Sequence, residues 1–361
     1  MSKIKAMIAM SGGVDSAVAA LLAVRAGYDC TGVTLRLLNS EKLCGTCDYL
    51  QNEKDAADVC RQLGISHEVI DLTQEFTEKV VMPFITDYEK GYTPNPCVYC
   101  NKHIKFGKMY DIAVERCFDK LITGHYAEIR YGSDDNEYHL FRGLDRKKDQ
   151  SYFLYGLSQP QLSKIEFPLG RYSKEEVRSM AVEAGLKVYS KHDSQDICFI
   201  PDGQYGEFIE SFTGKEYSVG EFVKTDGTVL GKHRGIIRYT VGQRKGLGLA
   251  LPAPLYVKEK DIINNRVILC NNDDLFKRTV KTENINFICN SSNMINGDEN
   301  SSLRVTAKIR YNHIEQLALL HFEDKRIICE FDEPQRAPAA GQALVFYVGE
   351  ECIGGGTIVT S

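Results

Sequence analysis

The stretch Ala9–Leu22, AMSGGVDSAVAALL, places a serine, two glycines, an aspartate and a second serine between an apolar run and an Ala/Leu-rich segment. The run before it, residues 4–10, is typical of a β-strand, and residues 16–27 have the pattern of a helix that ends at a glycine. A strand, a glycine-rich turn and a helix leave backbone N–H groups free at the positive end of a helix dipole. The sequence therefore predicts an anion site, with phosphate as its natural occupant.

The chain on both sides of this turn alternates short β-branched runs with helical patterns, from Lys5 to about Gly124. Further strands are expected over 30–38, 66–72 and 119–125, and a helix over 52–64 with Asn52 as its N-cap and Gly64 just past its end. This alternation predicts a doubly wound α/β domain, a parallel sheet with helices on its faces. In such sheets, ligands bind at the carboxyl ends of the strands.

The remaining chain has a different pattern. Residues 126–147 have the composition of a polar hairpin, and Ser173 and Glu176 form a capping box before a helix. A Gly-rich, basic segment with an Asp-Gly turn at 226–227 follows, and after about residue 260 alternating runs indicate an antiparallel barrel or sandwich. We expect an α/β domain over 1–203, a small central linker domain over 204–262 and a C-terminal antiparallel β-barrel over 263–361.

Composition limits the classes of protein that fit. The 361 residues suggest two or three domains, and 43% hydrophobic with 26% charged residues is typical of a soluble globular protein. No run approaches the roughly 18 apolar residues of a membrane span, and the N-terminus has no cleavage-site pattern. We therefore expect a cytoplasmic protein with no membrane partner. Its twelve cysteines indicate thiols, metal ligands or catalytic sulfur rather than disulfides.

The spacing of residues in the opening turn narrows the choice of its ligand. It lacks the G-x-G-x-x-G and Walker patterns but matches S-G-G-x-D-S over Ser11–Ser16. This pattern resembles the PP-loop of the ATP pyrophosphatases, which cleave ATP between the α- and β-phosphates and leave AMP on a substrate oxygen. We expect Gly12 and Gly13 to let the backbone approach the pyrophosphate, the two serines to donate hydrogen bonds, and Asp15 to hold Mg²⁺. The alternative is a plain strand-turn-helix corner capped by Ser11.

A second motif contains two cysteines. Residues 91–106, GYTPNPCVYCNKHIKF, place Cys97 and Cys100 after two prolines and just before a helix expected from about residue 101. A thiol near a helix N-terminus, with Lys102 and Lys105 close in sequence, should favour the thiolate and act as a nucleophile. A third cysteine, Cys198, lies in the polar segment KHDSQDICFIPDG.

Several motifs occur in a fixed order after the PP-loop: NPxxxCNxxIKF, TGHYA, KDQSYFL and SQDICFI. With these, and with YTVGQRKGLGL and the final barrel, the whole chain resembles the bacterial tRNA-specific 2-thiouridylases, or tRNA-uridine 2-sulfurtransferases. These enzymes place sulfur on C2 of the wobble uridine (position 34). The resemblance implies ATP and Mg²⁺ as cofactors, and as partners the tRNAs for Glu, Gln and Lys and a sulfur relay protein or cysteine desulfurase. AMP and pyrophosphate would be released.

The resemblance also implies roles position by position. It makes Cys100 the nucleophile and Cys198 the residue that carries sulfur as a persulfide. The positions at the nucleotide are Ala9, Met10, Ser11, Gly12, Gly13, Val14, Asp15, Ser16, Leu35 and Gly124. The positions at the target base are Asn95, Pro96 and Cys97. The positions that contact tRNA are His125, Lys148, Asp149, Gln150, Arg310, Tyr311 and Gln342.

Cys97 stands where many members of that family have aspartate, and the difference leaves two mechanisms open. With Cys100 and Cys198 it is one short of the four cysteines that fill a cluster, so a [4Fe-4S] cluster with one free iron could carry an extra sulfide. In the other route, a persulfide on Cys198 supplies sulfur and Cys100 releases it by forming a disulfide with Cys198. Both routes begin with adenylation of uracil O2.

Other features leave further alternatives. Cys44 and Cys47 form a second C-x-x-C, which is either a zinc half-site or a set of local thiols. The basic residues over 232–245 are either a solvated hairpin or a surface that contacts tRNA phosphates. His125 follows a strand end and is expected to face the ligand. A PP-loop amidoligase or synthetase, or a non-catalytic RNA-binding redox sensor, remains as another class of function, and neither needs Cys100 and Cys198.

Overall fold

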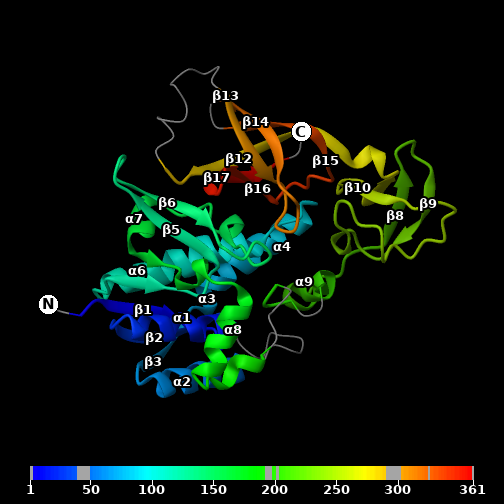
Figure 1. The fold of residues 1–361 in the computed structure, drawn as a ribbon. Coiled ribbons are helices and arrows are strands. Elements are labelled where there is room, and N and C mark those ends of the chain that lie inside the picture. Colours follow the sequence, from blue (N-terminus) through cyan, green and yellow to red (C-terminus); the bar gives the residue numbers. More distant parts are fainter. Residues whose placement is uncertain are drawn as a thin grey trace.

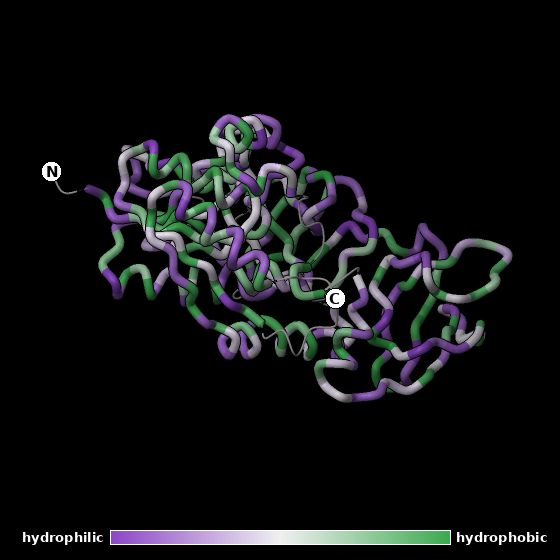
Figure 2. The backbone as a smooth tube through the Cα atoms, turned by 90° about the horizontal axis from the view of Figure 1, so that it is seen from below, coloured by the Kyte–Doolittle hydropathy of each residue, from purple (hydrophilic) through white to green (hydrophobic). Residues whose placement is uncertain are grey.

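The computed structural model describes residues 3–38, 49–191, 197–200, 203–289, 302–323 and 326–359. An α/β layer, a barrel above it and a smaller lobe at the side make up the molecule (Figure 1). Seen from below, the lobe projects from the main body (Figure 2). Among the described helices, none combines the length and apolarity that crossing a membrane requires.

The first sheet is parallel and has the strand order β3-β2-β1-β4-β7. Its strands are β1 (Lys5–Ala9), β2 (Asp29–Arg36), β3 (Ser66–Asp71), β4 (Lys120–Ile122) and β7 (Ile165–Glu166). Ala6 and Ile8 of β1 belong to one buried cluster and Met7, between them, to another, because side chains alternate along a strand. The doubly wound α/β prediction is therefore confirmed.

Helices cover both faces of this sheet. Residues of α1 (Val14–Arg25), α2 (Tyr49–Leu63) and α8 (Lys174–Glu183) share the cluster of Ala6 and Ile8. Residues of α3 (Thr73–Phe76), α4 (Met82–Glu89), α6 (Met109–Glu115) and α7 (Gln159–Lys164) share the cluster of Met7. The capping box of Ser173 and Glu176 is present at the start of α8, as predicted.

Two helix starts differ from the sequence prediction. α2 begins at Tyr49, so Asn52 lies inside it and is not its N-cap. The helix expected from residue 101 begins at Pro96 as α5 (Pro96–Tyr99), and a π-helical stretch, Cys100–Lys108, continues it into α6. Proline is pre-organised for the first turn of a helix, and the Asn95 side chain accepts a hydrogen bond from Cys97 N (3.2 Å) as the cap.

The lobe consists of α9 (Tyr205–Thr213) and a sheet of strand order β10-β11-β8-β9. Its strands are β8 (Gly220–Lys224), β9 (Val229–His233), β10 (Tyr256–Asp261) and β11 (Arg266–Cys270). The predicted Asp-Gly turn joins β8 to β9, and Gly227 has the positive φ of 87° that this turn requires. The sequence prediction missed α9.

The C-terminal strands close into an antiparallel barrel in the order β12-β15-β14-β13-β16-β17, with β12 pairing to β17. They are β12 (Phe276–Phe287), β13 (Ser302–Lys308), β14 (Gln316–Glu323), β15 (Arg326–Arg336), β16 (Ala343–Val348) and β17 (Glu351–Ile358). The predicted hairpin, β5 (Ala127–Gly132) and β6 (Glu137–Arg142), is part of the same sheet because β6 pairs with the start of β17. This pairing ties the α/β layer to the barrel.

Candidate functional site

The PP-loop has the geometry of an anion cradle. Gly12 has a φ of 72°, and a Cβ there would lie 2.3 Å from the carbonyl oxygen of Asn52, so only glycine fits. Ser16 Oγ donates to the Gly13 carbonyl (3.0 Å) and accepts from Ser11 N (3.2 Å). The serine hydroxyls, which we expected to donate to phosphate, thus also hold the shape of the loop.

The nucleotide positions outside the loop lie at the same edge of the sheet. A Cβ on Gly124 would lie 2.8 Å from the carbonyl carbon of Asp15 and 2.9 Å from Ser16 N, so the chain after β4 touches the PP-loop backbone. Leu35 lies in β2, two residues beyond Val33, which pairs with Ala9 of β1. Both positions are therefore at the carboxyl ends of strands, where ligands bind in such sheets.

Two lysines that the sequence prediction missed hold the loop. Lys174 Nζ lies 2.7 and 2.8 Å from the carboxylate oxygens of Asp15, which also accepts from Tyr126 OH (2.8 Å). Lys191 Nζ donates to the carbonyl of Gly12 (3.0 Å). They are 159 and 179 residues away along the chain, and no local pattern marks them. Each lysine also has a carboxylate partner, Asp15 for Lys174 and Asp55 for Lys191.

The two cysteines of α5 and the following π-helical stretch are not thiolates. Burial, with the nearby Cys100, raises the pKa of Cys97 to about 11, and the charge of Lys105 opposes this only in part. Burial likewise raises the pKa of Cys100. Our expectation of a favoured thiolate is therefore wrong, because desolvation of the charged form outweighs the lysine.

Cys198 has different surroundings. Its side chain is exposed, whereas Cys100 is buried. The next residue, Phe199, is buried and packs edge-on against Phe76 and Phe84, so the described segment 197–200 is anchored on α3 and α4. No disulfide joins cysteines of the described ranges, and Cys44 and Cys47 fall outside those ranges.

A line of contacts joins the PP-loop to the cysteine helix. Gly124 touches the loop, and the next residue, His125, lies with Nε2 3.5 Å from Lys105 Nζ. The His125 ring is buried between Phe106 and Phe167, and burial, with the charge of Lys105, lowers its pKa well below the usual range. We expected His125 to face a ligand, but its ring is in the interior as a neutral imidazole.

The positions over 148–150 form a loop pinned beside His125. Gln150 Oε1 accepts from Tyr126 N (3.0 Å), and Gln150 N donates to the Tyr126 carbonyl (2.8 Å). The buried carboxylate of Asp149 accepts from Gly143 N and Ser151 N, each at 3.1 Å. Asp149 thus shapes the loop, and Lys148 beside it is half-buried.

The barrel and the linking segments supply the remaining positions. Gln342 Nε2 donates to the carbonyl of Thr93 (2.7 Å), in the segment that leads to the cysteines. Arg310 Nη2 donates to the carbonyls of Val241 in the lobe (3.0 Å) and Ala337 (2.8 Å). Burial, then the charges of Asp149, Asp145 and Cys97, raises the pKa of Tyr311 to about 12. The α/β layer, the lobe and the barrel therefore meet at the cysteine helix.

A cavity of about 400 Å³ opens between the cysteine helix and the barrel. Its lining includes Asn95, Tyr99 and Asn101 on one side and Gly341 and Ala343 on the other. The buried Oδ1 atom of Asn101 accepts no hydrogen bond from the described residues. An unsatisfied buried acceptor is costly, so this atom suits a ligand that brings a donor.

Cys97, Cys100 and Cys198 do not share the coordination sphere of a single ion. Within the described ranges, the one set of three metal-ligating side chains whose donor atoms lie within 4.8 Å of one another is elsewhere, at His139, Cys289 and Glu351. A cluster spans longer sulfur–sulfur distances than a single ion does, so the iron–sulfur alternative stays a prediction.

Three domain families match consecutive parts of the chain. They are the tRNA methyl transferase HUP domain over residues 4–202, the tRNA methyl transferase PRC-barrel domain over 206–271 and the aminomethyltransferase beta-barrel domain over 277–358. Among solved structures, the U34-tRNA thiolase NcsA from Methanococcus maripaludis with its [4Fe-4S] cluster is 17% identical, and the match covers 58% of this chain and 70% of that one. Its TM-score is 0.35, which supports no functional conclusion.

Relatives match over nearly the full length. The tRNA-specific 2-thiouridylase MnmA of Acetivibrio thermocellus is 44% identical over 99% of this chain and 100% of its own. The proteins of the same name from Clostridioides difficile and Acidithiobacillus ferrooxidans are 42% and 44% identical, over 99% of this chain in each case and over 98% and 99% of their own. At this identity and coverage, the chain belongs to the family of the tRNA-specific 2-thiouridylases.

Proposed function

We propose that this protein uses ATP to replace O2 of the wobble uridine of tRNA by sulfur. The observation that carries the proposal is the line of contacts from the PP-loop through Gly124, His125 and Lys105 to the helix of Cys97 and Cys100. These contacts link the PP-loop to the helix with two thiols, which supports one shared site. Amide formation requires no such thiols, which disfavours an amidoligase.

In the first step, the PP-loop holds the pyrophosphate end of ATP while uracil O2 attacks the α-phosphate. The O–P bond that forms turns a poor leaving group into AMP, and pyrophosphate leaves. Asp15 would hold Mg²⁺ once its ion pair with Lys174 opens, and Lys174 and Lys191 would then offset the negative charge of the phosphates. The base must leave its stack to reach the site, where Asn95, Pro96 and Cys97 at the start of the cysteine helix contact it.

In the second step, the terminal sulfur of a persulfide on Cys198 attacks C2 of the adenylated uracil. Cys100 then attacks Cys198 Sγ, the S–S bond of the persulfide breaks, and AMP leaves as the C=S bond forms. The two cysteines end as a disulfide, which a thiol reductant must reduce before the next cycle. The exposed Cys198 suits loading by a sulfur relay protein or a desulfurase, and the buried Cys100 suits a step shielded from water.

We choose the Cys198 persulfide over a [4Fe-4S] cluster as the sulfur source because Cys198 is exposed and Cys100 is buried. A shared cluster would enclose Cys97, Cys100 and Cys198 alike, whereas Cys198 is open to solvent. We also propose that tRNAs for Glu, Gln and Lys are the substrates, that residues 204–262 contact tRNA and that the enzyme works in the cytoplasm.

The test is anaerobic purification with iron and sulfide analysis, coupled to a thiolation assay on wobble-uridine tRNA with ATP and a persulfide donor. We expect an iron-free protein that thiolates and releases AMP. Cys100→Ser and Cys198→Ser should each lower the rate at least about 10²-fold, the scale of losing a nucleophile.

The matched controls are Cys30→Ser for a buried thiol and Cys117→Ser for an exposed one, and both should keep the rate. A protein that thiolates only with iron and sulfide bound would replace the persulfide route with the cluster route. AMP release that is insensitive to both active-site substitutions, with no thiolated tRNA, would overturn the function itself.

A further inference from the structure

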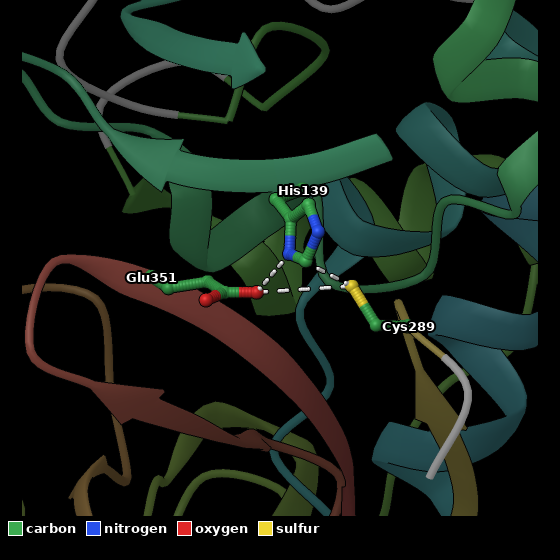
Figure 3. A group of neighbouring side chains, drawn as sticks. All are labelled: His139, Cys289 and Glu351. Atoms are coloured by element: carbon green, nitrogen blue, oxygen red, sulfur yellow. Dashed lines mark hydrogen bonds and ion pairs between the residues drawn. The ribbon is translucent and has the colours of Figure 1, made fainter. Parts of the chain in front are cut away.

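Three side chains from distant parts of the sequence converge outside the site described above. His139 Nδ1 lies 2.7 Å from Glu351 Oε1, and Cys289 Sγ lies 3.3 Å from His139 Nδ1 and 3.7 Å from Glu351 Oε1. Figure 3 shows the imidazole, the thiol and the carboxylate pointing toward one another. A nitrogen, a sulfur and an oxygen donor therefore face one small space.

The three residues come from elements that join two parts of the molecule. His139 is in β6 of the hairpin that follows the α/β sheet, Glu351 begins β17 of the barrel, and Cys289 lies just after β12. Cys289 is buried, while His139 and Glu351 have side chains about one fifth exposed (18% and 20%). The space is thus closed on the protein side and reachable from solvent.

A second carboxylate orients the imidazole. Asp135, in the turn of the same hairpin, lies with Oδ2 3.0 Å from His139 Nε2. When an ion displaces the Nδ1 proton that bonds to Glu351, Nε2–H still donates to Asp135 and the Nδ1 lone pair faces Cys289 and Glu351. A carboxylate on the far ring nitrogen is the usual support of a metal-bound histidine.

We propose that His139, Cys289 and Glu351 bind one Zn²⁺ ion, with water as the fourth ligand and Asp135 as a positioning residue. Zn²⁺ accepts nitrogen, sulfur and oxygen donors together, whereas Mg²⁺ and Ca²⁺ require oxygen ligands. Tetrahedral ligands at about 2.0–2.3 Å from zinc lie about 3.3–3.6 Å apart. The sulfur–nitrogen distance of 3.3 Å lies in this range, and the sulfur–oxygen distance of 3.7 Å is just above it. The His139–Glu351 contact of 2.7 Å opens by about 0.6 Å when the ion replaces the hydrogen bond.

Two carboxylates, those of Glu351 and Asp135, lie within hydrogen-bond distance of the His139 ring, so this position offers negative groups to a cation. A dication binds the Cys289 sulfur as thiolate, and the thiol proton goes to solvent. The bound ion would connect β6 to β17 beside their short pairing at Cys352 and Glu351. The inference does not depend on the proposed thiolation.

The experiment is a Co²⁺ titration of the full-length protein after dialysis against a chelator, without oxygen, followed by competition with Zn²⁺. We expect the unmodified protein to bind one more ion than Cys289→Ser, with a thiolate-to-cobalt absorption band that Cys289→Ser lacks. Glu351→Gln should weaken this ion's binding about tenfold or more, and Asp135→Asn about tenfold. Zn²⁺ should raise the melting temperature of the unmodified protein only.

The matched controls are Cys270→Ser, which removes a buried cysteine elsewhere, and His321→Gln, which removes a histidine of β14. Both should bind like the unmodified protein. Because Cys289→Ser removes a buried group, Glu351→Gln decides the matter if the serine variant fails to fold. Equal stoichiometry and an equal absorption band for Cys289→Ser and the unmodified protein, or an unchanged Co²⁺ affinity for Glu351→Gln, would overturn the proposal and leave a hydrogen-bonded cluster only.

Discussion

At the residue scale, burial separates the two cysteines that the proposed reaction uses. Cys100 is buried and Cys97 half-buried, desolvation raises the pKa of both thiols, and Cys198 is exposed. Lys105 beside the first two lowers their pKa values too little to compensate. A thiol in this environment stays inert until a substrate or a partner changes it.

The rates of alkylation should follow the exposure of these cysteines. With a pKa of about 11, on the order of one Cys97 in 10⁴ is thiolate at pH 7, so iodoacetamide should modify Cys198 well before Cys97 and Cys100. The rate at Cys97 should rise about tenfold per pH unit between pH 7 and 9, because the raised pKa lies above that range. Peptide mass mapping over time measures both, with the exposed Cys117 as reference. Cys100 reacting as fast as Cys198 would contradict the burial argument.

Gly124 is a second position where one added carbon atom would disturb the PP-loop. Gly124→Ala puts a Cβ 2.8 Å from the Asp15 backbone, so the PP-loop must shift. We expect a loss of about 1–3 kcal/mol in the free energy of unfolding, together with weaker ATP binding. Urea unfolding and a nucleotide titration measure these. Gly156→Ala is the control, because its Cβ would meet only Lys102 Cδ at 3.9 Å, and equal effects of the two substitutions would refute the steric reason.

At the scale of elements, the helix that carries Cys97 and Cys100 depends on its first residues. Pro96 occupies the first turn, and Asn95 caps it through Cys97 N. The π-helical stretch that follows keeps Cys100 and Ile104 buried. The orientation of the two thiols therefore follows from the start of this helix.

Asn95→Ala removes the cap, and we expect a loss of about 1 kcal/mol in stability because the first-turn N–H groups lose their acceptor. Asn95→Asp keeps an oxygen at the same place and should restore the stability. Thermal melts of the three proteins measure the difference. If Asn95→Asp melts like Asn95→Ala, the cap is not the cause.

At the scale of the whole molecule, the barrel completes the site. Gln342 bonds to Thr93 ahead of the cysteines, Tyr152 OH donates to the carbonyl of Ala343 (2.8 Å), and β6 pairs with β17. Arg310 also links the lobe to the segment after β15. Hydrogen bonds and strand pairing therefore join the three parts of the molecule.

A chain shortened to residues 1–271 should lose this support. It exposes the edge of β6 and the buried ring of Tyr152, so we expect aggregation and binding of a hydrophobic dye. Gln342→Ala in the full chain is the milder comparison, since it breaks one hydrogen bond and should cost about 0.5–1.5 kcal/mol. Size-exclusion chromatography and dye fluorescence distinguish the shortened chain from Gln342→Ala. A shortened chain that stays monomeric and melts cooperatively would show that the α/β layer folds alone.

Local patterns determined the fold class and the PP-loop, because strand alternation, glycine turns and helix caps are set by residues near one another in sequence. The S-G-G-x-D-S spacing also located the phosphate cradle, and the motif order identified the family. Tertiary structure alone decided the charge states of Cys97, Cys100 and His125, which follow from burial by distant residues. It likewise brought Lys174 to Asp15 and His139 to Glu351, 159 and 212 residues apart, because only folding makes such pairs neighbours.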